Sequence, residues 1–116
     1  MKPIYVVIYH ECDDISPVGA FMCYQDAVDA MKEDMTKELM CMVHDRQRAE
    51  EIIAQASESE DEVLSNFEEY PSLVVWIDTY AGQATLGMYH IGRDWTILEI
   101  DKVVENQSTE EQEEQK

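Results

Sequence analysis

The chain has 116 residues and carries 26 acidic against 8 basic side chains, which gives a formal net charge of -18 at pH 7. Its length suits a single domain, and its hydrophobic content of 45% suits a packed core. Because so acidic a chain repels phosphate groups, DNA, RNA and anionic membranes are disfavoured as direct ligands. The apolar runs are much shorter than a membrane span, and the N-terminus is typical of a strand rather than a signal peptide, so we expect a cytoplasmic protein.

The first half of the chain predicts a strand followed by helix. Ile4–Glu11 is rich in β-branched and aromatic side chains, which favour a strand, whereas residues 12–20 contain the aspartate, proline and glycine that are typical of a turn. From Gln25 onward, apolar side chains recur every three or four positions and form one helical stripe: Val28, Met31, Met35, Leu39 and Met42, then Ala49, Ile53 and Ala56. This pattern allows either one helix over residues 25–56 or two helices broken near Asp45 and Arg46.

The second half predicts a short helix and three strands. Ser59 and Glu62 match a capping box, which predicts a helix over residues 60–69. Residues 73–80, 84–91 and 95–104 are typical of strands, and the short glycine-containing links between them favour an antiparallel meander. We therefore expect one α+β domain over residues 1–104, with the helices packed on one face of a four-stranded sheet. Residues 105–116 lack apolar side chains and are expected to be a disordered acidic tail.

The sequence contains only weak signals of a metal site or a catalytic site. His10 with Cys12, and Cys41 with His44, are pairs of zinc-ligand types, but their spacing matches no familiar zinc motif, and Cys41 adjoins an apolar stripe where a cysteine can act as a small hydrophobe. The three cysteines include no C-x-x-C pair and favour reduced thiols. Because no phosphate-binding loop or nucleophile motif is present either, we expect neither metal nor cofactor, and no enzymatic activity.

Four aromatic side chains are candidates for a binding surface. Alternation along a strand places Tyr5 and Tyr9 on one face of the first strand, and Trp76 and Tyr80 on one face of the second. If the helices cover only the aliphatic face, these rings form a patch suited to a partner or a second subunit. The alternative is that a two-faced core or a loop of the chain itself covers them.

Acidic residues are concentrated between residues 45 and 69. The candidates for contact with a basic partner are Glu50, Glu51, Glu58, Glu60, Asp61 and Glu62. A helix rises about 1.5 Å per residue and can project carboxylates at separations comparable with those of phosphates. The alternative is a solvated face that serves only solubility.

In size, charge and acidic tail, the chain is similar in composition to small phage or mobile-element proteins that mimic DNA and inhibit restriction or CRISPR nucleases, although no motif is shared. The leading hypothesis is therefore a non-enzymatic inhibitor that occupies a nuclease or another protein with a basic surface. The second hypothesis is an interaction module that forms a homodimer through the aromatic sheet face. The third is a small metal-dependent enzyme that uses His10, Cys12, Cys41 and His44.

Overall fold

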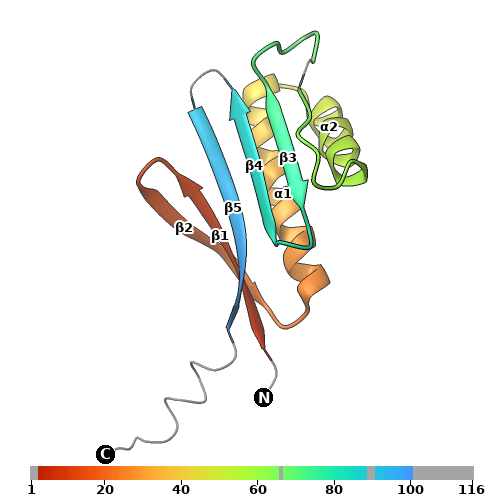
Figure 1. Cartoon of the computed structure of the whole chain (residues 1–116). Helices are drawn as coiled ribbons and strands as arrows, with labels where there is room; N and C mark the ends of the chain where they lie inside the picture. The colour runs from red at the N-terminus through yellow and green to blue at the C-terminus, as the bar shows by residue number, and fades with distance from the viewer. Residues whose placement is uncertain (1–2, 66, 89–90, 101–116) are drawn as a thin grey trace, which may run out of the picture.

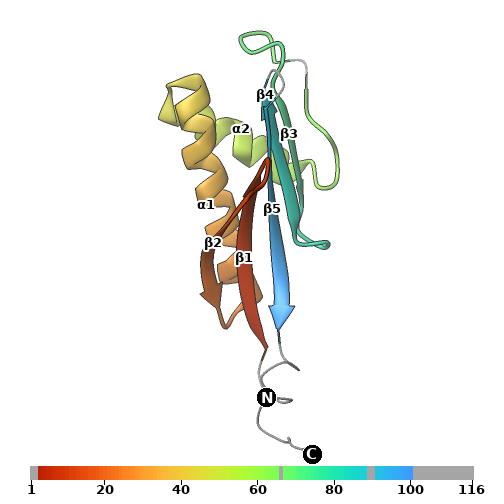
Figure 2. The ribbon, with the colours of Figure 1, turned by 90° about the vertical axis from the view of Figure 1, so that its left-hand side faces the viewer.

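The computed structural model describes residues 3–65, 67–88 and 91–100. They form a two-layer α+β structure in which two helices cover one face of a five-stranded antiparallel sheet (Figures 1 and 2). The strand order is β2-β1-β5-β4-β3, so β5 lies in the centre. The elements are β1 (Ile4–Glu11), β2 (Asp14–Phe21), α1 (Tyr24–Val43), α2 (Arg46–Glu58), β3 (Val74–Asp78), β4 (Gln83–Met88) and β5 (Ile91–Ile100). The α+β class, the first strand and the antiparallel meander are confirmed.

The prediction of four strands is wrong because the expected turn over residues 12–20 contains β2. This strand pairs with β1 at the edge of the sheet, and the register shifts where Val7 faces Gly19 and Ile8 faces Pro17. The shift leaves Val18 as an extra residue, which is the signature of a β-bulge. Proline is tolerated at an edge and at a bulge, where its missing N–H breaks no ladder, so turn-type residues did not prevent a strand.

The link expected at residues 92–94 is also wrong, because these residues lie inside β5. Gly92 pairs with Gly87 of β4, and Arg93 pairs with Leu86 on one side and with Glu11 on the other. The guanidinium of Arg93 is 17% exposed, and its Nε lies 3.0 Å from Glu38 Oε1 on α1. This ion pair allows a charged residue to continue the strand under the helix. The predicted strand residues 101–104 and the predicted tail over residues 105–116 lie outside the described residues.

The helical region consists of two helices, as the second of the two alternatives predicts. His44 ends α1 in the left-handed conformation with φ of 58°, and its N–H donates to Met40 O at 2.7 Å. Asp45 then caps α2, because its Oδ1 accepts the N–H of Arg48 at 3.1 Å. The apolar stripe faces the sheet from α1, and Ile52 joins Ala49, Ile53 and Ala56 among the buried residues of α2.

The helix predicted over residues 60–69 is absent, and the segment runs along the free edge of β3 instead. Leu64 and Val75 exchange both backbone hydrogen bonds, at 2.8 and 3.0 Å, and Phe67 is buried at 7% exposure. The unpaired edge of β3 offered these backbone partners, and the local capping signal of Ser59 and Glu62 could not outweigh them. Ser59 ends α2 rather than beginning another helix.

The core lies between the helices and the inner face of the sheet. Its largest side chain is Trp95 of β5, which is 1% exposed. The indole Nε1 of Trp95 donates to Asp34 Oδ2 on α1 at 2.8 Å, so a helix carboxylate satisfies the buried donor. At the N-terminal end of α1, the Tyr24 hydroxyl donates to the backbone oxygen of Thr79. These two bonds tie α1 to the centre of the sheet and to the end of β3.

Candidate functional site

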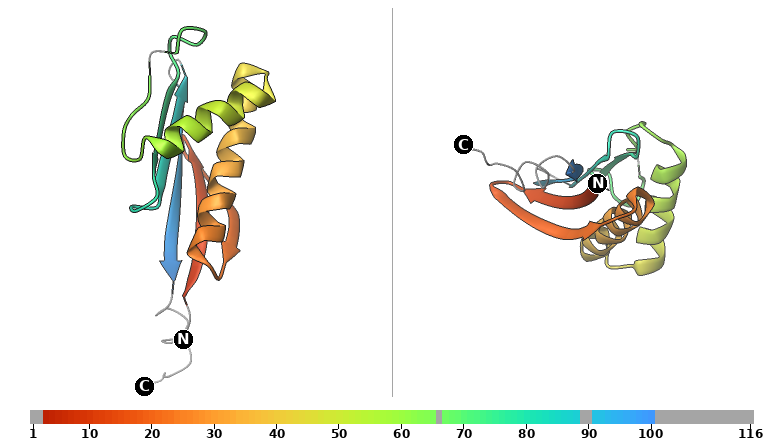
Figure 3. Two further views of the ribbon diagram at one scale, coloured as in Figure 1. Left: turned by 90° about the vertical axis from the view of Figure 1, so that its right-hand side faces the viewer. Right: turned by 90° about the horizontal axis from the view of Figure 1, so that it is seen from below.

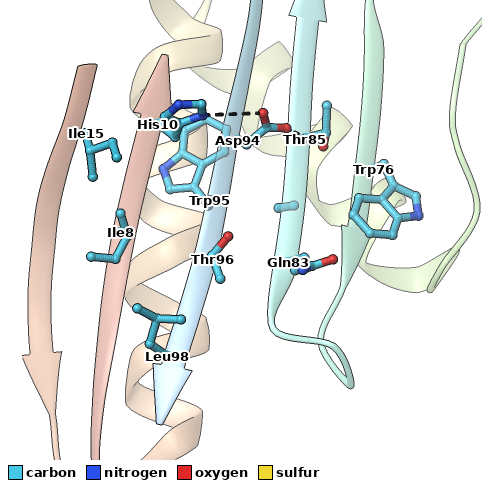
Figure 4. Close-up of a pocket in the computed structure, with 11 residues that line it drawn as sticks. Ile8, His10, Ile15, Trp76, Gln83, Thr85, Asp94, Trp95, Thr96 and Leu98 are labelled. Carbon is cyan, nitrogen blue, oxygen red and sulfur yellow. Dashed lines mark hydrogen bonds and ion pairs between the residues drawn. The ribbon is translucent and has the colours of Figure 1, made fainter. Parts of the chain in front are cut away.

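The structure presents two candidate surfaces, and the first is the sheet face that the helices leave uncovered. It carries an open groove of about 560 Å³ (Figure 4). We call this surface the open face and define it by Ile8, His10, Ile15, Trp76, Gln83, Thr85, Asp94, Thr96 and Leu98. Ile15 of β2 is 66% exposed and Leu98 of β5 is 47% exposed, so the groove has uncovered apolar side chains at the edge and in the centre of the sheet.

A row of five side chains crosses the open face from one edge of the sheet to the other. Strand register places Ile15, His10, Asp94, Thr85 and Trp76 side by side in that order. Thr85 Oγ1 donates to Asp94 Oδ1 at 2.8 Å, and His10 Nδ1 lies 4.0 Å from Asp94 Oδ2 (Figure 4). The one carboxylate of the row therefore accepts a hydrogen bond from Thr85 on one side and faces His10 on the other.

The four aromatic candidates do not form one patch, which corrects that prediction. Tyr5 and Tyr9 lie on the helix-covered face, where Tyr5 packs edge-on against Tyr24 with ring centroids 5.3 Å apart and Tyr9 packs against Trp95. Trp76 lies on the open face. Tyr80 follows β3 in the turn before β4 and is 93% exposed. The prediction failed because alternation assigns faces within a strand but cannot show which face of β1 matches which face of β3.

Tyr9 is part of a polar network beneath α1. Its hydroxyl donates to Glu11 Oε1 at 2.7 Å and lies 3.3 Å from Glu38 Oε1, and Arg93 pairs with both carboxylates. Burial, followed by the hydrogen bond to Glu11 and the charge of Glu38, raises the pKa of Tyr9 well above its ordinary value of 10.0. The hydroxyl is thus held in its neutral form as a donor in the folded protein.

This pKa shift predicts a loss of stability in alkali. Above about pH 10 an unfolded tyrosine releases its proton while Tyr9 in the folded protein keeps it, so rising pH favours the unfolded state. We expect the free energy of unfolding to fall between about pH 9 and 11, and Tyr9→Phe to reduce that slope. Urea unfolding at several pH values measures how the free energy of unfolding depends on pH. Tyr80→Phe, at an exposed site, is the control. An unchanged slope in Tyr9→Phe would show that the network does not hold this proton.

The second candidate surface is the acidic region, and the structure divides its predicted residues into three groups. Glu50 pairs with Arg46 at 3.1 Å and Glu51 with Arg48 at 3.5 Å, all on the exposed side of α2. Glu60 is a structural residue, because its Oε1 accepts both the backbone N–H and the hydroxyl of Thr79. Glu58, Asp61 and Glu62 are exposed and have no ion-pair partner among the described residues.

The contacts of Glu60 gather the free carboxylates at one corner of the molecule. Asp61, in the left-handed conformation with φ of 62°, donates its N–H to Ile77 O at 3.0 Å, so residues 60 and 61 lie against the end of β3. The exposed ring of Tyr80 directly follows Thr79 there, in a turn held by Asp78 Oδ1, which accepts the N–H groups of Tyr80 and Ala81. We call Glu58, Asp61, Glu62 and Tyr80 the acidic corner.

Among the described residues, most positive charge is paired and does not balance this surface. In the described part of the chain, Lys37, Arg46, Arg48 and Arg93 each pair with a carboxylate, and Lys32 is the exception. Arg48 is paired twice, with Glu51 and with Glu69, and the hydrogen bond that its Nη2 donates to Glu69 Oε1 at 3.2 Å is the main reason that its pKa is raised. The acidic excess of the composition therefore appears on the surface without local reversal.

The candidate metal ligands give no site in the structure. His10 and the exposed Cys12 lie at the end of β1, whereas Cys41 and His44 lie at the end of α1. Cys41 is exposed, so the expectation that it packs as a small hydrophobe is wrong. Across residues 3–65, 67–88 and 91–100, no group of three His, Cys, Asp or Glu side chains is arranged to hold a metal ion.

Sequence reasoning missed two features of these surfaces. Ile15 joins the open face because β2 exists, and the aspartate, serine, proline and glycine of residues 14–19 give that strand no clear sequence signal. The role of Glu60 depends on Thr79, 19 positions away, and has no local signal.

Comparison with protein families, with curated proteins and with solved structures finds no match for this chain. Within the described residues, no helix is both long enough and apolar enough to cross a membrane.

Proposed function

We propose that the protein is a non-enzymatic binding protein whose acidic corner engages a protein partner with a basic surface. The observation that carries this proposal is that Glu58, Asp61 and Glu62 are exposed and unpaired, while nearly all described basic side chains are paired elsewhere. Exposed carboxylates of one sign produce a field that accelerates encounter with a positively charged partner.

The position of the corner argues against a purely structural role for its charges. Glu58 is the last residue of α2, where the backbone carbonyls already carry partial negative charge, and the last turn of the helix contains no basic residue. Helix stability alone would favour lysine or arginine at that end. The carboxylate is therefore placed where it strengthens the negative potential and weakens the helix.

Tyr80 gives the corner an apolar contact beside its charges. A ring that is 93% exposed contributes nothing to the core, and aromatic side chains are favoured at the centres of protein interfaces. The partner class that best matches an acidic surface with an aromatic anchor is a protein that itself handles nucleic acid, such as a nuclease. The carboxylates would then occupy the place of phosphates in its basic groove.

A stability measurement tests the charge placement without knowledge of the partner. Glu58→Gln should raise the free energy of unfolding by about 0.3–1 kcal/mol at low salt, because it removes a negative charge from the negative end of α2. Asp26→Asn, the same kind of change in the first turn of α1, should lower it by a similar amount. A loss of stability in Glu58→Gln would show that this carboxylate has a structural partner.

Affinity capture from the native host tests the proposal itself. The wild-type bait is compared with the triple variant Glu58→Gln, Asp61→Asn, Glu62→Gln, and with a charge-matched control, Asp13→Asn, Asp14→Asn, Glu33→Gln. The control residues are also exposed and lie in the β1–β2 hairpin and on the outer side of α1. The proposal predicts a basic protein that is retained by the wild type and the control and lost by the triple variant. Equal capture by all three baits would contradict it.

A further inference from the structure

We propose that the open face is the interface of a symmetric homodimer, an inference that goes beyond the proposed function and uses different residues. The first reason is the charge of the surface. Eleven residues line the groove, and they include one carboxylate, Asp94, and no lysine or arginine. In a chain with a net charge of -18, this is a nearly neutral apolar surface.

Because the open face carries few charges, it favours a second copy of this chain over a partner with a basic surface. A partner with a basic surface would find one carboxylate here, and Asp94 is already bonded to Thr85 and faces His10. Two copies of an acidic chain repel each other least when they meet through the surface that carries the fewest charges. Depletion of charge together with a half-exposed tryptophan, Trp76, and exposed aliphatic side chains is also the composition of interface cores.

The open face is self-complementary, as an isologous contact requires. Each copy supplies an imidazole, His10, and a carboxylate, Asp94, on neighbouring strands β1 and β5. A two-fold axis parallel to the strands and between β1 and β5 places His10 of each copy opposite Asp94 of the other. The exposed side chains of Ile15 and Leu98 are then covered by the second sheet, in a sandwich with sheets about 10 Å apart.

The size of the face is adequate for such a contact. The sheet has five strands and its longest strand, β5, has ten residues. Summed over strand lengths of 8, 8, 5, 6 and 10 residues, at about 3.3 Å per residue and about 4.8 Å between strands, the face covers at most roughly 590 Å². Two such faces bury roughly 1,200 Å², which is the lower end of the range for specific interfaces.

In the homodimer the helix layers face outward, as Figure 2 and Figure 3 show for one copy, so each acidic corner stays free and the assembly presents two of them.

The sign of the salt dependence provides the test. Two like-charged chains that meet through an apolar face should associate more tightly as salt rises, because screening removes repulsion. Contact with a basic partner has the opposite dependence. We therefore measure sedimentation of the full chain over a range of concentrations up to about 100 μM, at ionic strengths of about 0.02 M and 0.5 M.

We expect a dimer that strengthens with salt and that Leu98→Glu weakens at least about tenfold, because the new carboxylate would be buried without a partner. Met22→Glu is the matched control, since Met22 is 70% exposed and does not line the groove, and it should dimerise like the wild type. Circular dichroism should show both variants folded.

A monomer at both ionic strengths would overturn the proposal, as would a dimer that Leu98→Glu leaves intact or that weakens with salt. A monomer whose Leu98→Glu variant loses a captured host protein would show that a different protein occupies the face. None of these outcomes changes the result of the acidic-corner experiments, so failure of the dimer and failure of the proposed function are distinguishable.

Discussion

Trp95→Ala should destabilise the protein more than any other single truncation. The side chain is the largest buried one, at 1% exposure, and its removal leaves a cavity between α1 and the centre of the sheet. Truncation of a buried tryptophan costs about 3–5 kcal/mol, a large part of the roughly 5–15 kcal/mol by which a domain is stable. Asp34 also loses the N–H that it accepts. Urea unfolding followed by far-ultraviolet circular dichroism measures the loss.

Two further variants separate the causes of this effect. Trp95→Phe keeps most of the apolar area but removes the indole donor, so it should cost less than the alanine variant. Trp76→Ala, on the half-exposed tryptophan of the open face, should cost much less than Trp95→Ala when measured at concentrations where the chain is monomeric. Equal destabilisation by Trp76→Ala and Trp95→Ala would contradict the assignment of inner and outer sheet faces.

The sequence predicted well the elements whose hydrophobic pattern is contained in one segment and repeats many times. The stripe of α1 repeats over about four turns, and Val28, Met31, Met35 and Leu39 are all buried as the periodicity requires. Elements decided by distant partners were predicted poorly. β2 exists because β1 has a free edge, and the segment with Leu64 is extended because β3 has another.

The same distinction applies to the candidate site. The concentration of acidic residues is visible in the sequence, but which of their carboxylates are free of ion pairs depends on contacts that no local pattern contains. Glu60 is held by Thr79, and Glu51 shares Arg48 with Glu69, which lies beyond the end of α2. Alternation also could not reveal that Tyr5 and Tyr9 face α1 while Trp76 faces away from it.

Association kinetics can show whether the acidic corner recognises a basic partner through charge. The partner retained in the capture experiment is immobilised, and the wild type, the triple corner variant and the charge-matched control are compared over a series of salt concentrations. The corner variant and the control have the same net charge, so any difference between them reports the position of the charges. Tyr80→Ala is measured alongside them as the test of the aromatic anchor.

We predict that the corner variant associates about tenfold more slowly than the control at low salt, and that this difference shrinks as the screening length falls from about 10 Å at 0.1 M to about 3 Å at 1 M. Tyr80→Ala should instead accelerate dissociation at every salt concentration, because it removes contact area rather than long-range charge. If the corner variant associates as fast as the control at low salt, Glu58, Asp61 and Glu62 are only a solvated surface and the proposed function is wrong.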